Sequence, residues 1–300
     1  MYEVNIKGYT MEELFRIISF PSFINLIERK QERYVSPAMW EDTYECYLMR
    51  MIEQETNTRF IIEKFFRELS PKNIQAVIDN YMKLLAARWL CVGQCWSKIP
   101  ESDALWRIYS YDRMSVRIRS NANKIQELIN DEGLNHYNIV IDDVKYDLEA
   151  DNIIDRQLEI IKDTQRIVEP FFHKRKAFEH ECEKRVIITD NYDIQIYGSL
   201  TGRLALTNFH FQIKEKGYTD APPEDEILNL LEKNIIEMRN IAESCKSKIC
   251  RILPIPDLSS YIEGVMVHPQ ADDWIVSLVE SICKRTGLNF EGKSRLYSAL

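Results

Sequence analysis

The sequence predicts an α+β fold in which mixed, largely antiparallel sheets are flanked by helices. Segments with helical spacing and segments of alternating polarity follow one another without the regular strand–helix alternation of a doubly wound sheet. The chain contains no GxGxxG and no GKS/T loop, which argues against classical Rossmann and P-loop nucleotide binding. It has no internal repeat and only nine glycines, so we expect a single α+β domain over residues 1–300.

The composition is that of a globular protein with an acidic surplus. Apolar residues make up 45% and charged residues 29%, which argues against a disordered or collagenous chain. Lysine and arginine total 39, and aspartate and glutamate total 47, so the formal charge is −8. This balance argues against a protein that coats nucleic acid or anionic lipid by its net charge.

The chain shows no targeting or membrane signal. Residues 1–7 lack a basic start followed by an apolar stretch, and no run approaches the roughly 18–20 apolar residues of a membrane helix. The seven cysteines form no CxxC, and the five histidines form no HExxH. We therefore expect a cytoplasmic protein with reduced, mostly buried thiols, no membrane contact and no metal site.

The N-terminal half is predicted to hold long helices between short strands. Residues 11–27 are predicted to form a short strand or a helix pair around residues 14–18, and residues 32–36 a strand that Pro37 ends. Helical spacing extends over residues 42–69, and Ser70-Pro71 opens a further helix. There follow a buried strand over 89–96, a helix over 102–109 and an alternating strand over 115–119.

The C-terminal half is predicted to be richer in short strands. Residues 137–142 and 144–148 resemble a hairpin with Asp142-Asp143 as its turn. After a helix over 151–172 and a strand over 185–188 come short alternating segments at 194–197, 203–206 and 209–213. Two helices, over 223–242 and 271–284, enclose a strand over 261–267, and a short strand ends the chain.

The densest polar cluster lies at residues 178–188. If a strand begins there, Glu181, Glu183 and Arg185 share one face of it. Two carboxylates and a guanidinium on one face are either a solvated surface or a catalytic carboxylate that Arg185 holds. Sequence spacing alone leaves both interpretations open.

Five short motifs, taken in chain order, resemble the prokaryotic domain-of-unknown-function family 2971. They are Phe15-Arg16, residues 34–37 with Asp42 and Glu45, Cys95-Trp96-Ser97, Leu105-Trp106 with Tyr109, and Phe178 with Glu181, Glu183 and Arg185. Residues 262–269 fit the closing strand of the family, whereas residues 40–43 replace its Asn-Asp-Pro segment. Residues 190–250 look longer than the family core, which predicts an insertion. The family name itself carries no activity.

A looser resemblance connects the chain to ADP-ribosyltransferases, which combine an Arg, a Ser and a Glu on successive strands. Arg16, Ser36 and Glu183 are the matching positions, and we expect them to converge in one cleft of an ADP-ribosyltransferase-like fold. The resemblance implies that Arg16 holds the NAD pyrophosphate, that Ser36 positions the nicotinamide ribose and that Glu183 stabilises the charge on the sugar. Glu181 would orient the acceptor. Trp40, Tyr109 and Arg185 are further candidates for NAD contacts.

The resemblance thus implies an NAD-dependent ADP-ribosyltransferase or NAD glycohydrolase, of the kind found among toxins and phage-defence effectors. Cleavage of NAD⁺ builds positive charge on the ribose, which a fixed carboxylate stabilises, and arginine suits a pyrophosphate. NAD would be the substrate and no metal would be needed. A protein or nucleic-acid acceptor, water as acceptor and a regulatory partner protein all stay open.

Two other classes of function compete with this one. A non-catalytic module for a ligand, a partner or nucleic acid would use the carboxylates as structural ion pairs to Arg185 and Arg117. In that case Arg113, Arg117 and Arg119 would form a basic stripe. A metal-dependent nuclease would instead gather Asp42, Glu45, Glu181 and Glu183 around Mg²⁺ or Mn²⁺.

Overall fold

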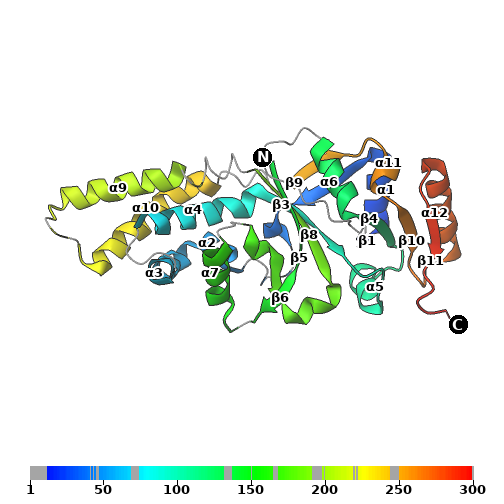
Figure 1. Ribbon diagram of the computed structural model, residues 1–300, viewed down its shortest axis with the longest axis horizontal. Coiled ribbons are helices and arrows are strands. Elements are labelled where there is room, and N and C mark those ends of the chain that lie inside the picture. Colours follow the sequence, from blue (N-terminus) through cyan, green and yellow to red (C-terminus); the bar gives the residue numbers. More distant parts are fainter. Residues whose placement is uncertain are drawn as a thin grey trace, which may run out of the picture.

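The fold is organised around a nine-stranded, mixed and mostly antiparallel sheet, which confirms the predicted α+β class with flanking helices (Figure 1). The computed structural model describes residues 12–40, 42, 44, 47–68, 74–131, 137–149, 151–164, 168–190, 198, 200–218, 220, 222–243 and 250–298. The strands of the sheet are β1 (Glu13–Ile18), β2 (Gln31–Val35), β3 (Cys91–Ser97), β4 (Val116–Asn121), β5 (Tyr137–Asp143), β8 (Glu183–Asp190), β9 (Cys250–Pro254), β10 (Gly264–Val267) and β11 (Phe290–Lys293). Strands β6 (Lys145–Leu148) and β7 (His173–Arg175) form a separate parallel pair.

The sheet forks at β3. On one edge, β8 pairs with all of β3, from Cys91 opposite Thr189 to Ser97 opposite Glu183. The other edge of β3 is shared, because β1 pairs with it at Ser97 and β2 pairs with it at Gly93. Between these two positions the branch β1-β4-β10-β11 separates from the branch β2-β9. β1 and β2 therefore diverge along that edge of β3.

Helices cover both faces of the sheet and create two separate cores (Figure 1). The first core is built by α2 (Tyr47–Glu53), α3 (Thr58–Glu68), α4 (Ile74–Leu90), α7 (Ile153–Thr164), α9 (Thr201–Glu215) and α10 (Glu224–Glu243). Of these, α4 packs against β3 and β8, whereas α3, α9 and α10 pack on α4 and on one another. The second core lies between the sheet and α1 (Phe20–Arg29), α6 (Ala122–Asp131), α11 (Leu258–Tyr261) and α12 (Asp273–Thr286). Because side chains alternate along a strand, Ile187 enters the first core while Val186 and Ile188 enter the second.

Short 3₁₀ helices and local caps connect these layers. The 3₁₀ helices are η1 (Pro37–Met39), η2 (Glu55–Asn57), η3 (Glu169–Phe172) and η4 (Lys176–Glu181). Helix α5 (Asp103–Tyr109) begins as predicted at Ser102, whose hydroxyl accepts the Leu105 N–H at 3.1 Å. Helix α12 ends at Gly287, whose φ of 73° suits a residue without a Cβ.

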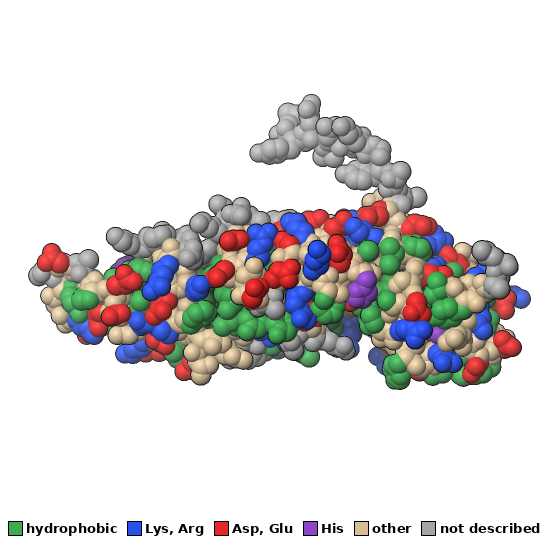
Figure 2. Space-filling view, turned by 90° about the horizontal axis from the view of Figure 1, so that it is seen from below, with side chains coloured by type: hydrophobic (Ala, Val, Ile, Leu, Met, Phe, Trp, Pro, Cys, Tyr) green, Lys and Arg blue, Asp and Glu red, His purple; other side chains and the backbone are tan. Residues whose placement is uncertain are grey.

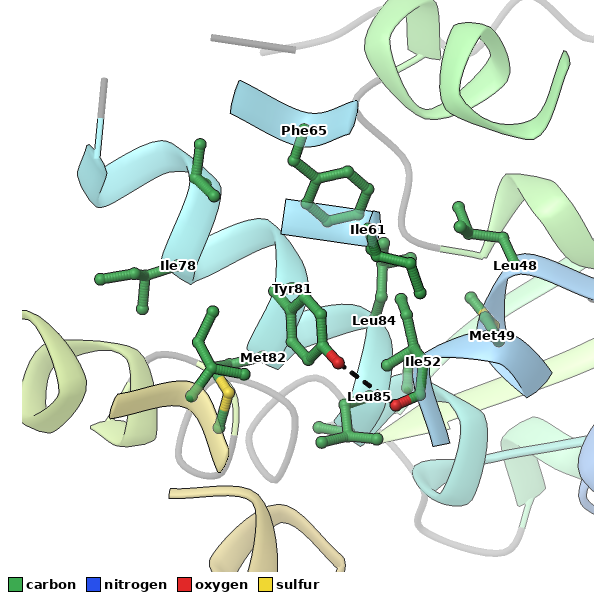
Figure 3. Close-up of a cluster of buried hydrophobic side chains, with 14 of the residues drawn as sticks. Leu48, Met49, Ile52, Ile61, Phe65, Ile78, Tyr81, Met82, Leu84 and Leu85 are labelled. Carbon is green, nitrogen blue, oxygen red and sulfur yellow. Dashed lines mark hydrogen bonds between the residues drawn. The ribbon is translucent and has the colours of Figure 1, made fainter. Parts of the chain in front are cut away.

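In the first core, the buried hydroxyl of Tyr81 links three helices by hydrogen bonds (Figure 3). The Tyr81 hydroxyl on α4 donates to the Ile52 carbonyl at 3.3 Å and lies 3.2 Å from the Thr58 hydroxyl. It ties α4 to the end of α2 and the start of α3. We expect Tyr81→Phe to lower the free energy of unfolding by about 1 kcal/mol, measured by chemical denaturation. An unchanged midpoint would show that this link adds nothing to stability.

The structure corrects several predicted elements. The expected hairpin is wrong, because β5 pairs with β8 and β6 pairs with β7. The predicted short strands at 203–206 and 209–213 are wrong, because both lie in helix α9, which packs beside α10 and α4. The helix predicted over 42–69 is broken at η2, and helix α6 has no counterpart in the predicted pattern. The proposal that residues 190–250 are an insertion stays a prediction.

Candidate functional site

A cavity of about 870 Å³ opens at the fork of the sheet. It brings together five of the predicted site residues with one that the sequence analysis missed: Arg16, Trp40, Tyr109, Glu181, Glu183 and Lys174. These residues come from β1, the segment after η1, α5, η4, β8 and β7. The cavity therefore gathers side chains that are up to 167 positions apart in the sequence, as between Arg16 and Glu183.

Glu183 is a buried carboxylate held by two cations. It begins β8, and its Oε2 accepts from Arg185 Nε at 2.8 Å and lies 2.6 Å from Arg185 Nη2. Its Oε1 accepts from Lys174 Nζ at 3.0 Å. Burial opposes ionisation, but the charge of Arg185, with Glu181 and Lys174 as further partners, lowers the pKa of Glu183 to about 2. Glu183 is thus a fixed negative charge at neutral pH.

Glu181 lies beside Glu183 but not on the strand, which corrects the predicted single strand face. It is the last residue of η4, and Cys182, with a φ of 44°, turns the chain into β8. Its Oε2 accepts from Lys174 Nζ at 2.7 Å. Burial, together with the hydrogen bond and negative charge of Glu183, raises the pKa of Glu181 to about 8. The two neighbours are therefore a neutral acid and a carboxylate at pH 7, which is a common basis for acid–base division of labour.

Arg185 supports Glu183 instead of lining the cavity, which corrects its predicted contact with the cofactor. The guanidinium is fully buried, and its Nη1 donates to the Phe171 carbonyl at 2.6 Å. The Trp40 ring covers it at 4.5 Å, while Trp40 itself reaches the cavity. A Cβ at Gly93 would come within 3.2 Å of the Trp40 ring and 2.6 Å of Ile187, so the absence of a side chain there makes room for this stack.

Arg16 and Glu183 line the same cavity from opposite faces of the sheet. Phe15 pairs with Ser97, and Ser97 pairs with Glu183, so these positions are about 10 Å apart, two strand spacings. Arg16 is next to Phe15 and points to the other face, where it contacts Glu32 at 3.2 Å and the Trp96 ring at 5.9 Å. A ligand that touches both residues has to pass through the fork.

Ser36 does not reach the cavity, which corrects the predicted role in positioning the ribose. Its hydroxyl donates to the Arg88 carbonyl at 2.6 Å and accepts the Ala38 N–H at 3.2 Å. Ser36 is fully buried as the N-cap of η1, immediately before Pro37. The side chain therefore caps the 3₁₀ helix η1. Helix α4 packs over it, so a substrate in the cavity cannot contact it.

Tyr109 lines the cavity, and its predicted contact with NAD stays a prediction. It ends α5, and burial together with the charges of Glu181 and Glu183 raises the pKa of its hydroxyl well above the ordinary value. Lys174 is the contact residue that the sequence analysis missed. It lies on a strand of three residues whose pattern gives no signal, and only the pairing of β7 with β6 places it between the two glutamates.

The nuclease hypothesis finds no support among the described residues. Asp42 lines the cavity, but its carboxylate pairs with Arg175 at 3.0 Å. Glu45 lies outside the described residues. Within the described part of the chain, no group of three or more His, Cys, Asp or Glu side chains is placed to hold a metal ion.

Two of the three arginines in the basic stripe expected for a nucleic-acid binder, Arg117 and Arg119, are paired with carboxylates of the protein. Arg117 pairs with Glu291, and Arg119 pairs with Glu13 at 2.7 Å and with Glu291 at 2.8 Å. On the face in Figure 2, basic and acidic side chains are interspersed. Neither observation favours a phosphate backbone as the ligand, because such binding needs an uncompensated row of cations.

The described chain contains no helix long and apolar enough to cross a membrane. Its cysteines Cys91, Cys95, Cys182, Cys250 and Cys283 are free thiols. Comparison with known proteins gives no match, neither among family models nor among curated proteins or solved structures.

Proposed function

We propose that this protein cleaves the glycosidic bond of NAD⁺ and transfers the ADP-ribosyl group to an acceptor or to water. The observation that carries the proposal is that Glu183, paired with Arg185, and Glu181 both contact Lys174 and line one cavity. Burial and the charge of Glu183 raise the pKa of Glu181, and the charge of Arg185 lowers the pKa of Glu183. A cavity of about 870 Å³ falls within the range of about 300–1,000 Å³ that is usual for small-molecule and cofactor sites. Of the three residues that carry the looser resemblance to ADP-ribosyltransferases, Arg16 and Glu183 reach the cavity and Ser36 does not, so the support for this substrate comes from the first two alone.

The reaction requires a negative charge close to the sugar. When the bond between C1′ of the ribose and the nicotinamide nitrogen breaks, the electron pair leaves with neutral nicotinamide and positive charge develops on the ribose. Glu183 supplies a carboxylate whose position Arg185 and Lys174 hold. Such a charge stabilises the transition state without reorganisation at the moment of reaction.

The acceptor must lose a proton as its oxygen or nitrogen bonds to C1′. In this proposal the Glu181 carboxylate takes that proton, so that charge and atoms balance. Tyr109 and Trp40 supply apolar surface at the cavity, and Arg16 contributes a guanidinium at the fork for the diphosphate. Because Arg16 already pairs with Glu32, it is oriented before the ligand arrives.

The protonation of Glu181 sets an expected pH dependence. Glu181 acts as a base only after it loses its proton, and its pKa is about 8. We expect turnover to rise about tenfold per pH unit below this value and to level off above it. The measurement is the rate of nicotinamide release from about pH 6 to about pH 9, with a protein-free blank at each pH. A rate that falls as pH rises through this range would mean that the leaving group needs a proton, which NAD⁺ does not.

The direct test is NAD⁺ loss and nicotinamide release by the purified protein, with DNA, RNA and cell lysate each offered as acceptor. The expected result is release that depends on the protein, with label from adenine-labelled NAD⁺ on one acceptor or in free ADP-ribose. If the folded protein neither binds NAD⁺ nor releases nicotinamide with any acceptor, the proposal fails. The ion pairs around Glu183 would then serve stability alone.

A further inference from the structure

Lys174 contacts both glutamates of the cavity at once. Its ammonium group lies between two carboxylates, 2.7 Å from Glu181 Oε2 and 3.0 Å from Glu183 Oε1. The Phe178 ring lies 4.5 Å from the same nitrogen. Lys174 is buried and also lines the cavity. A buried lysine in contact with both members of an acid–carboxylate pair affects both whenever a proton moves.

The two glutamates differ in the number of cations that they contact. Glu183 has a cation on each carboxylate oxygen, Lys174 on Oε1 and Arg185 on Oε2. Within the described part of the chain, the one cation in contact with Glu181 is Lys174. Loss of the Glu181 proton would therefore place two carboxylates side by side, with Lys174 as the charge between them. Without it, the second negative charge would have no counter-ion in a buried site.

We propose that Lys174 is a positioning residue that allows Glu181 to give up and regain a proton by compensating the carboxylate that forms. This inference deepens the proposed function and rests on it for its catalytic meaning. Its physical content, a coupling between Lys174 and the ionisation of Glu181, does not depend on the substrate.

Other groups around Glu181 do not replace this effect. Tyr109 on α5 and Tyr146 on β6 face the pair, and burial beside the glutamates raises the pKa of each hydroxyl, so both stay neutral. The Tyr146 oxygen accepts the Glu183 N–H at 2.7 Å. Arg185 contacts Glu183, and Cys95 on β3 lies on the same face as Arg185. Lys174 is thus the cation placed to respond when Glu181 ionises.

The test compares the carboxyl titration of Glu181 in the wild type, Lys174→Met and Lys174→Arg by NMR of ¹³C-labelled glutamate without NAD⁺. Glu181→Gln identifies the signal by its loss. Lys174→Met is expected to raise the proton affinity of Glu181 by about tenfold or more, while Lys174→Arg stays within about twofold of the wild type. A Lys174→Met protein whose Glu181 titrates like the wild type would overturn the inference.

A second measurement needs no substitution at Lys174, in case Lys174→Met does not fold. In the wild type, the ¹⁵Nζ signal of Lys174 is expected to shift with the same midpoint as the Glu181 carboxyl, because the two groups share a hydrogen bond. Independent midpoints would contradict the coupling. If nicotinamide is not released but the titrations of Lys174 and Glu181 are coupled, the proposed function fails and this inference holds. If nicotinamide is released but the titrations are independent, the proposed function holds and this inference fails.

If the proposed function and the coupling between Lys174 and Glu181 both hold, the pH profile of turnover should follow the titration of Glu181. Lys174→Arg is expected to keep the midpoint of the wild-type profile, and Lys174→Met to move the rise of activity to higher pH. A residue that served folding alone would lower the rate without moving the midpoint.

Discussion

Replacing Glu183 with Gln is expected to lower nicotinamide release by about 10³-fold or more, because the charge that stabilises the ribose is removed. The side chain keeps its size, so the shape of the cavity stays the same. NAD⁺ affinity should change little, since the carboxylate acts chiefly on charge that develops in the transition state. The measurement is the single-turnover rate beside NAD⁺ binding by calorimetry.

This variant needs a control for folding, because it leaves Arg185 and Lys174 each with one partner fewer in a buried site. Glu179→Gln is the matched control, since Glu179 lies on the 3₁₀ helix η4, four residues before Glu183, but is exposed. It should behave like the wild type in rate and in stability. A folded Glu183→Gln protein that still releases nicotinamide at the wild-type rate would end the assignment of Glu183 as the catalytic carboxylate.

Replacing Arg185 with Met is expected to lower the free energy of unfolding by about 3–5 kcal/mol, because Glu183 would stay buried with half of its charge compensation lost. The guanidinium is fully buried and also donates to the Phe171 carbonyl, which would lose its partner. The expected loss is a large part of the stability of an ordinary domain. Urea denaturation at neutral pH measures it.

The matched control is Arg107→Met on α5. Arg107 also pairs with a carboxylate, Asp103 at 2.7 Å, but its side chain is 74% exposed. Exposed pairs of this kind contribute little because water screens the charges. Similar midpoints for Arg185→Met and the wild type would show that Arg185 is not the support of Glu183. A loss of stability that disappears in the double variant Arg185→Met with Glu183→Gln would identify the unpaired carboxylate as its cause.

The arrangement of the layers explains why a buried ion pair can lie at this point. Glu183 and Arg185 are the first and third residues of the central strand β8. Helices of the first core cover one side of this strand end, and the cavity at the fork lies beside it. Trp40 seals Arg185 from solvent, so the ion pair acts in surroundings of low polarity. Because the Glu183–Arg185 pair is buried, removing one partner is costly. For the same reason, water screens the charge of Glu183 only weakly at the cavity.

Local patterns identified those parts of the site that are close together in the sequence. Glu181, Glu183 and Arg185 are two positions apart, so their grouping needed no knowledge of distant segments. Ser36 shows the limit of this approach. A serine before a proline is as well suited to cap a 3₁₀ turn as to face a substrate, and the packing of Arg88 against it decides which one occurs.

The pairing of strands was beyond the reach of such patterns. Residues 137–148 alternate like a hairpin, but β8, about forty positions later, takes β5 as its neighbour. Apolar and polar residues alternate over 203–213 as they do in a strand. The segment is nevertheless helical, because α9 packs against α10 and α4. The periodicity of a segment shows which of its side chains are apolar, but it does not show which other segments will pack against them.

The sequence by itself determined the α+β class, most helix and strand positions, and the acid pair with its arginine. The tertiary structure alone decided that Lys174, Tyr109 and Arg16 meet that pair in a cavity at the fork, and that Ser36 does not. The physical reason is that hydrogen bonding and side-chain polarity act locally, whereas convergence depends on long-range strand pairing and on which apolar faces bury one another.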